Sequence, residues 1–238
     1  MGLFDKKYCD ICGEKLSLLG NKKLVDGSIC KNCEALLSPH FTDRKKASLS
    51  DIKDQLAYRE ENKKNVAKFN VTRIIGRSTK VIFDEDSRKF MVTSAEDWEL
   101  KNPDVIDFSE VTECDTKIRE NKTELKFKDN DGKEVSFSPK QYNIDYDFFV
   151  TIQLNSPWFN FMYFSINDRS VDTLYSSEYR DMEQGLKDIK RILTQPRIKV
   201  LVAAGSSSET KEGQKCSYCG AISENNSSKF CEFCGGEF

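Results

Sequence analysis

The stretches Tyr8-Cys-Asp-Ile-Cys-Gly13 and Cys30-Lys-Asn-Cys33 decide how the start of the chain folds, because they place four cysteines as two C-x-x-C pairs. The end of the chain repeats the pattern in Cys216-Ser-Tyr-Cys219 and Cys231-Glu-Phe-Cys234. A C-x-x-C turn brings two thiolates to one edge of a tetrahedron, and two such turns supply the four sulfur ligands that zinc prefers. The spacings C-x2-C-x17-C-x2-C and C-x2-C-x11-C-x2-C lie within or just below the range of ribbon-type zinc sites.

Glycine supports this interpretation, since it adopts the positive φ that the end of such a turn can require. Gly13, Gly220 and Gly235 each follow the second cysteine of a pair, whereas Glu34 breaks the pattern once. Because four cysteines close the coordination shell, we expect both sites to be structural, not catalytic. The predicted ligands of two Zn²⁺ ions are Cys9, Cys12, Cys30, Cys33, Cys216, Cys219, Cys231 and Cys234.

Two other uses of paired cysteines remain open at this point. Disulfides suit exported proteins, but the N-terminus has no apolar core followed by a cleavage site, so we expect a cytoplasmic chain with reduced thiols. A redox site would need one pair at a helix start in a βαβ unit, not four pairs in matched sets. Cys114, the ninth cysteine, lies in a strand-like stretch and is interpreted as a buried structural thiol.

Composition limits the classes of function. The chain has 238 residues, with 37 Lys and Arg against 39 Asp and Glu, and so lacks the basic excess of a general nucleic-acid binder. Sixteen Phe and eight Tyr argue against a disordered chain. No apolar run approaches the length of a transmembrane helix.

The middle of the chain alternates between apolar and polar residues, as strands do. Residues 122–128 and 133–137 flank the turn signal Asn130-Asp131-Gly132, and residues 79–83 and 88–93 flank a second predicted hairpin. Before them, residues 48–65 are predicted to be a helix with Ser48 or Ser50 as N-cap, and the charged run 58–64 indicates a solvated end. We therefore predict an α+β fold, with an antiparallel β sandwich or barrel as its main domain.

Two later segments complete that domain. Residues 175–194 place Tyr175, Tyr179, Met182, Leu186, Ile189 and Leu193 at helical spacing, which predicts an amphipathic helix packed on the sheet. A coiled-coil or membrane-surface helix is the alternative. The stretch Trp158–Ile166 is apolar on both faces, which fits a buried strand or, alternatively, a partner-binding face with Trp158, Phe159, Phe161 and Tyr163.

The predicted organisation has five parts. They are a zinc ribbon at 1–47, a connector helix at 48–68, a β domain with its closing helix at 69–196, a flexible linker at 197–215 and a second ribbon at 216–238.

Three resemblances add to this interpretation. The run MGLFDKKYCDICGEK at residues 1–15, with Leu18-Leu19-Gly20, Ser38-Pro39 and residues 55–61, resembles a bacterial zinc-ribbon family of unknown function. The strand series, the segment 105–111 and the single closing helix resemble a bacterial pleckstrin-homology-like domain, which implies partner binding. The acidic turn 84–86 differs from a basic lipid-binding loop, and residues 216–238 resemble the rubredoxin-like knuckles of bacterial scaffold proteins.

The expected function is a non-enzymatic, zinc-binding adaptor or scaffold that contacts other proteins, with peripheral membrane contact and the oligomeric state left open. A nucleic-acid-binding regulator acting through a ribbon is the alternative, although neither end shows a clustered basic face. An enzyme is not favoured, because His40 is the only histidine and no phosphate loop or nucleophile elbow is present.

Overall fold

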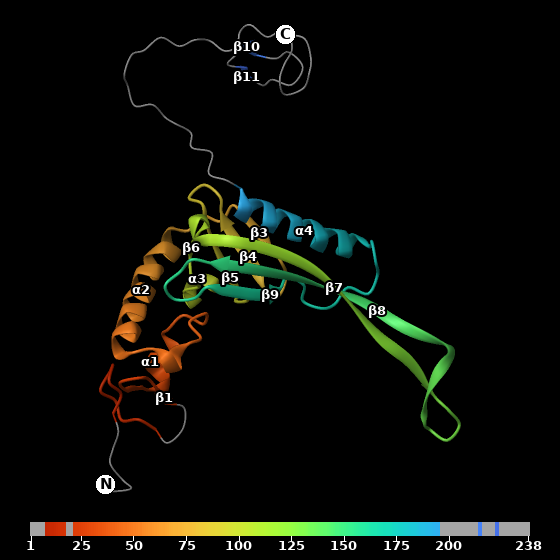
Figure 1. The fold of residues 1–238 in the computed structure, drawn as a ribbon, viewed down its shortest axis with the longest axis horizontal. Helices are drawn as coiled ribbons and strands as arrows, with labels where there is room; N and C mark the ends of the chain where they lie inside the picture. Colours follow the sequence, from red (N-terminus) through yellow and green to blue (C-terminus); the bar gives the residue numbers. More distant parts are fainter. Residues whose placement is uncertain (1–7, 18–20, 196–213, 216–221, 224–238) are drawn as a thin grey trace. The chain divides into compact units, whose positions relative to one another are not determined.

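A computed structural model describes residues 8–17, 21–195, 214–215 and 222–223. The chain divides into two compact units, residues 1–196 and residues 197–238, and each is described by itself. The fold is mixed α and β, and every strand pair among the described residues is antiparallel (Figure 1).

The first unit begins with a small module built around the two cysteine pairs. Strands β1 (Lys22–Lys23) and β2 (Ser28–Ile29) form a short ladder, followed by helix α1 (Lys31–Ala35) and the 3-10 turn η1 (Arg44–Lys46). A separate apolar cluster fills this module, and its buried members include Leu24, Ile29, Leu37, Phe41 and Ile52. Such a small core is marginal by itself, so the module depends on further contacts.

Helix α2 (Leu49–Lys68) connects this module to the β domain. Its start is a capping box, in which the Ser48 hydroxyl accepts from the Asp51 N–H and the Asp51 carboxylate accepts from the Ser48 N–H. This confirms Ser48 as the N-cap. The interpretation of residues 58–64 as a solvated end is wrong for Arg59 and Asn62, because both are buried on the face that points into the protein.

Seven of the described strands form the two antiparallel sheets of the β domain. The first has the order β3 (Arg73–Ile75), β4 (Lys80–Asp84), β5 (Lys89–Thr93), β6 (Ile106–Asp107), with α3 (Trp98–Lys101) between β5 and β6. After the 3-10 turn η2 (Phe108–Glu110), the second has the order β7 (Val111–Lys128), β8 (Glu134–Leu154), β9 (Phe161–Ser165). Both predicted hairpins are confirmed, but these seven described strands form two open sheets and no closed barrel.

The β7–β8 hairpin is much longer than the rest of its sheet. Near its base β9 pairs with Phe149–Gln153, whereas the distal half has no third strand and projects from the body of the first unit (Figure 1). Gly132 takes a φ of +78° in the predicted turn. In this distal half the apolar residues Leu125, Phe127 and Val135 are exposed.

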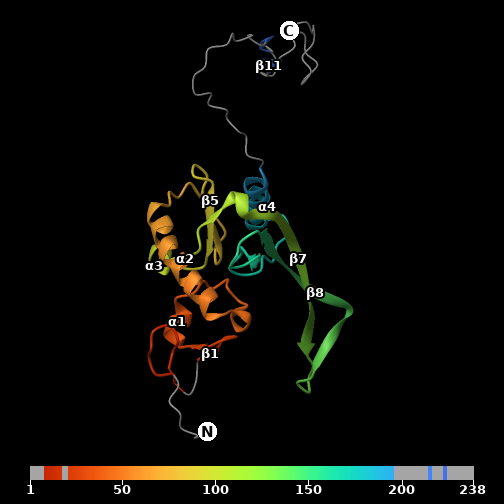
Figure 2. The ribbon, with the colours of Figure 1, turned by 60° about the vertical axis from the view of Figure 1, so that its left-hand side comes forward.

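Helix α4 (Ser177–Thr194) closes the domain by packing on β7 and β8, as the second view also shows (Figure 2). Its apolar stripe is buried, from Tyr179 and Met182 to Leu193. The predicted inclusion of Tyr175 in the helix is wrong: the helix starts after its N-cap Ser176, and Tyr175 lies before it with a positive φ. Cys114 faces the same core, which confirms its predicted burial.

Of the second unit, the structure describes only β10 (Gln214–Lys215) and β11 (Ile222–Ser223). The predicted linker and C-terminal ribbon otherwise lie outside the described residues. Among the described helices, none has the length and apolar composition needed to cross a membrane.

Candidate metal centre

The sulfur atoms of Cys9, Cys12, Cys30 and Cys33 form a compact cluster within 4.8 Å of one another. The Sγ atoms of Cys9 and Cys33 are 3.8 Å apart, and those of Cys12 and Cys30 are 3.6 Å apart. A tetrahedron with Zn–S bonds of about 2.3 Å has sulfur–sulfur edges of about 3.8 Å. A disulfide requires about 2.05 Å, so the five described cysteines are unbridged and four of them have the spacing of metal ligands.

Local backbone geometry holds these thiols in place. The N–H of Gly13, at a φ of +73°, donates to the carbonyl of Cys9 at 2.8 Å and closes the first C-x-x-C turn. The second pair lies at the start of α1, where Cys30 is the N-cap and its sulfur accepts from the Cys33 N–H at 3.4 Å. The Cys30 N–H in turn donates to the Cys9 sulfur at 3.3 Å, which joins the two turns.

The cluster is electrostatically suited to a cation. Burial raises the pKa of Cys9, but backbone N–H donors from Cys12, Cys30 and Ile11 outweigh it and lower that pKa to about 6. Burial is the largest influence on Cys33, and the sulfurs of Cys12 and Cys30 add to it, so the pKa of Cys33 lies well above its ordinary value. A bound cation offsets the influences that raise the pKa of Cys33, because a thiol that coordinates a metal ion is deprotonated.

Four thiolates around one ion leave no coordination position for water or substrate, which is the arrangement of a structural site. The module can therefore hold one metal ion with Cys9, Cys12, Cys30 and Cys33. The other predicted ligands, Cys216, Cys219, Cys231 and Cys234, lie outside the described residues.

Residues 7–55 match the family model described as "Domain of unknown function (DUF4428)". The matched region contains all four clustered cysteines and the first turns of α2. This agrees with the expected N-terminal ribbon-like unit of unknown function. Searches of curated proteins and of solved structures gave no match.

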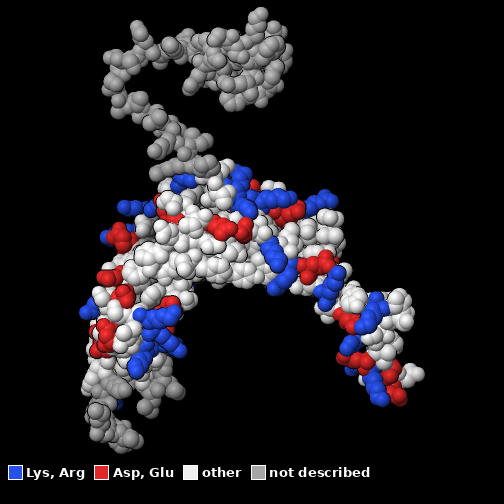
Figure 3. Space-filling model, viewed as in Figure 1, with Lys and Arg blue, Asp and Glu red and all other residues white. Residues whose placement is uncertain are grey.

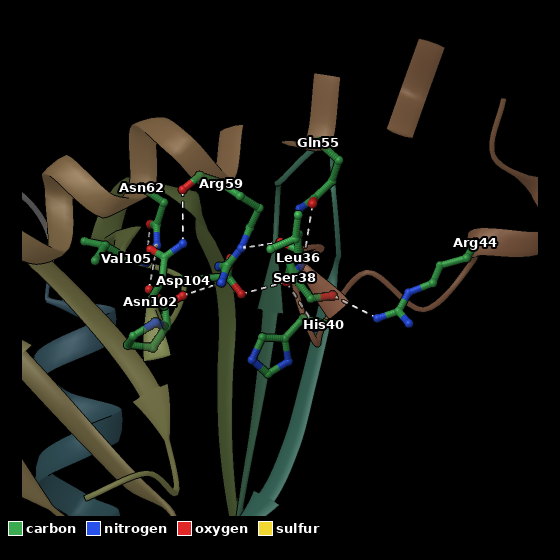
Figure 4. Close-up of polar contacts among 11 residues, drawn as sticks. Leu36, Ser38, His40, Arg44, Gln55, Arg59, Asn62, Asn102, Asp104 and Val105 are labelled. Carbon is green, nitrogen blue, oxygen red and sulfur yellow. Dashed lines mark hydrogen bonds and ion pairs between the residues drawn. The ribbon is translucent and has the colours of Figure 1, made fainter. Parts of the chain in front are cut away.

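Residues 8–47, which hold the four cysteines and are called the metal-binding module from here on, are joined to the β domain by a buried polar network (Figure 4). Asp104, in the loop before β6, accepts from the Arg59 guanidinium at 2.8 Å and from the Ser38 hydroxyl at 2.6 Å. Arg59 also donates to the carbonyl of Leu36 at 3.3 Å and to that of Asn102 at 2.5 Å. One guanidinium on α2 therefore bonds to both the metal-binding module and the β domain.

Two amides of α2 extend this network. The Gln55 side chain accepts from the Ser38 N–H at 3.2 Å, and the Asn62 side chain accepts from the Val105 N–H at 2.9 Å. Asn62 also donates to the carbonyl of Pro103 at 2.7 Å. These residues were not predicted from the sequence, although Gln55, Arg59, Asn62 and Val66 recur at the 4-3-4 spacing of one helix face.

The residues predicted for a partner surface divide into two groups. Phe159 is buried, with its ring 5.3 Å from that of His40, and Trp158 is half-buried between Phe41 and Tyr58. The metal-binding module and α2 cover these two residues, which therefore pack the module and α2 against the β domain. Phe161 and Tyr163 are exposed on β9, with 53% and 55% of their surfaces accessible.

Proposed function

We propose that this protein is a non-enzymatic adaptor in which zinc ions fix small ribbons and a β domain presents a surface to a protein partner. The observation that carries the proposal is the four-sulfur cluster at tetrahedral spacing, in a module clamped to the β domain through Ser38 and Arg59. Soft thiolate ligands in a closed tetrahedron favour zinc among the common metals. In this arrangement the ion supplies rigidity and no reaction.

A second zinc in the C-terminal segment is part of the proposal. Lys215 pairs with Ile222 across Cys216 and Cys219, and Tyr8 pairs with Lys15 across Cys9 and Cys12. Both antiparallel pairs join the residue before the first cysteine to the third residue after the second cysteine. The same hairpin register at both cysteine pairs supports the same use of the thiols.

The pleckstrin-homology-like interpretation also belongs to the proposal. Four antiparallel strands, three antiparallel strands and one closing helix follow one another in the chain, which supports the pattern on which that resemblance rests. Domains of this kind bind partners through their surfaces, so the interpretation agrees with an adaptor.

An aromatic group on the outer face of β8 and β9 supports protein binding. Tyr163 stacks on Phe149 at 5.0 Å and 3°, and the guanidinium of Arg119 lies 4.4 Å from the Phe149 ring centre. Together with Phe161 they form a surface of the residue types enriched in protein interfaces.

The charge pattern supports a protein partner over nucleic acid. Lys and Arg are interspersed with Asp and Glu along the β7–β8 hairpin, and uncharged surface dominates the middle of the face in Figure 3. Phosphate backbones require clustered cations. A nucleic-acid-binding regulator is therefore the second candidate. Tight, salt-dependent binding of nucleic acid in a filter-binding assay would support it.

Elemental analysis tests the metal part of the proposal. The purified chain should contain two zinc ions, Cys12→Ser one, Cys219→Ser one and the double variant none. Cys114→Ser is the matched control, since this thiol is buried in the β domain, and it should keep both ions. A metal-free wild-type chain that is still folded would remove the central claim.

Cross-linking in extracts of the native host tests the adaptor part. A protein partner should be captured by the wild-type chain and lost on Phe161→Ser with Tyr163→Ser. Tyr142→Ser on the distal hairpin, a comparably exposed aromatic, should retain the partner. Equal capture by all three proteins would argue against this surface.

A further inference from the structure

A cleft of about 480 Å³ runs along β9, a size within the range of ligand pockets, which is roughly 300–1,000 Å³. Four consecutive residues of β9, Phe161 to Phe164, line it. Successive side chains of a strand point to opposite faces of the sheet, so a cleft that touches four in a row follows the edge of the strand. β9 is the last strand of its sheet, and no strand among the described residues lies beside this edge.

The register between β8 and β9 shows which backbone groups face the open edge. The Leu154 N–H donates to the carbonyl of Asn160 at 2.9 Å, and the Ile166 N–H donates to that of Phe148 at 2.9 Å. Because hydrogen-bonded and non-hydrogen-bonded pairs alternate in an antiparallel ladder, Met162 and Phe164 bond toward β8. The N–H and C=O groups of Phe161 and Tyr163 therefore point away from β8, and no described residue bonds to them.

The walls of the cleft determine what can reach this edge. Pro39 and His40 of the metal-binding module form one wall, and Thr93 and Ser94 at the end of β5 form another. Just beyond the far end of β9, the Arg77 N–H bonds to the Ile166 carbonyl at 2.7 Å. A recessed edge admits a single extended chain more readily than the sheet of a second folded copy.

Charges in the cleft further restrict the ligand. Asp104 lines the cleft, but its two carboxylate oxygens already accept hydrogen bonds from Arg59 and Ser38. Lys101 also lines the cleft, and the one ion pair that its ammonium makes with a described residue is an exposed pair with Asp97 at 3.5 Å, which is worth little. The wall therefore favours an acidic side chain over a basic one.

We propose that the open edge of β9 binds an extended peptide segment of a partner protein as an added antiparallel or parallel strand. The N–H and C=O groups of Phe161 and Tyr163 form the backbone hydrogen bonds. Alternate peptide side chains, aromatic or β-branched, pack beside Phe161 and Tyr163 on the outer face. The side chains between them enter the cleft, where Lys101 selects an acidic residue. This inference rests on the proposed adaptor function and names its partner chemistry.

The zinc-loaded full-length chain, screened against a phage-displayed library of short random peptides, provides the test. Enriched peptides are synthesised with a fluorescent label and titrated by fluorescence anisotropy. Tyr163→Pro should weaken binding by up to about tenfold, since it removes an outward N–H whose hydrogen bond is worth up to roughly that factor. Proline is tolerated where a strand N–H faces away from the sheet. Tyr163→Ala keeps that N–H and is the matched control for loss of the side chain, so it should bind more tightly than Tyr163→Pro.

A second measurement does not depend on any variant of the protein. N-methylation of the peptide, one residue at a time, should weaken binding at every second position, because only alternate N–H groups of an added strand face β9. Loss at all positions, at no position, or with the period of a helix would overturn the proposal. A library that enriches no peptide would overturn it as well.

The two proposals fail in different ways. If no peptide binds but Phe161→Ser with Tyr163→Ser still abolishes cross-linking in the host extract, the partner uses the outer side-chain face. The adaptor function then stands without strand addition. If peptides bind as expected but no host protein is captured, the edge is a peptide site and the adaptor function is contradicted.

Discussion

The guanidinium of Arg59 and the carboxylate of Asp104 lie 2.8 Å apart, and their side chains are only 8% and 1% exposed. The two residues come from α2 and from the loop before β6, so the ion pair joins elements that are distant in sequence. The Ser38 hydroxyl donates to the other carboxylate oxygen. The position of the metal-binding module is therefore tied to two buried charges, one on α2 and one in the β domain.

We expect Arg59→Met to cost about 3–5 kcal/mol of unfolding free energy, because it leaves the Asp104 charge buried without its partner. The double variant Arg59→Met with Asp104→Leu should recover part of this loss. Lys46→Met, which breaks the exposed pair with Asp43, is the control and should leave stability unchanged. Urea denaturation checks all three, and equal losses for the single and double variants would argue against the ion pair as the cause.

We also expect metal removal to expose Trp158. Its ring lies 6.1 Å from Phe41 of the metal-binding module and 5.9 Å from Tyr58 of α2. Because the core of that module is small, chelation should loosen Phe41 and let water reach the indole. In a Trp98→Phe background, a chelator should shift the emission of Trp158 to longer wavelength, and added zinc should reverse the shift.

The converse variant, Trp158→Phe, isolates Trp98, which packs on Phe69 in the β domain and should not respond to the chelator. If the emission of Trp98 shifted as much as that of Trp158, metal loss would unfold the whole first unit.

Local patterns predicted much of this fold. Alternating side chains and the Asn130-Asp131-Gly132 turn predicted the β7–β8 hairpin, because the period of a strand and the φ of a turn glycine are local properties. The clustering of the four N-terminal sulfurs was also predicted from a local pattern, since the spacing of the two C-x-x-C pairs is that of ligands to one metal ion.

The interface between the module and the β domain was not predictable in that way. Arg59 and Asn62 lie in a charged run that is typical of a solvated helix, and only Asp104 and Pro103, some 40 residues later, give them buried partners. The open edge of β9 has a similar origin: it depends on strand order, which no residue of Phe161–Ser165 encodes by itself.

Gly185 on α4 offers a test of how the helix closes the domain. A Cβ at this position would lie 2.9 Å from the Cγ2 of Ile75 on β3. Gly185→Ala improves helix propensity by up to about 1 kcal/mol, but overpacking typically costs about 1–3 kcal/mol, so we expect a net loss of stability. Adding Ile75→Ala should make the alanine at 185 favourable in a double-mutant cycle, and thermal melts that show simple additivity would contradict the predicted contact.

Acid should weaken the second sheet through Asp147. Its carboxylate accepts from Arg119, Asn121, Asn167 and Ser170 at 2.7–3.0 Å. Burial raises the pKa of this group, but the donors outweigh burial and hold the pKa well below its ordinary value of about 3.9. A carboxyl whose pKa is depressed by folding stabilises the protein fully above its unfolded pKa and loses that contribution as pH falls toward its folded pKa.

The wild-type chain should therefore exceed Asp147→Asn in unfolding free energy at about pH 5, and the difference should shrink toward about pH 3. Acid also protonates the clustered cysteine thiolates, but both proteins carry the same cysteines, so this effect cancels in the difference. Asp181→Asn, on the exposed side of α4, is the surface control and should follow the wild-type curve. Urea denaturation across this pH range measures the three curves, and a difference between wild type and Asp147→Asn that grows on acidification would reverse the assigned sign.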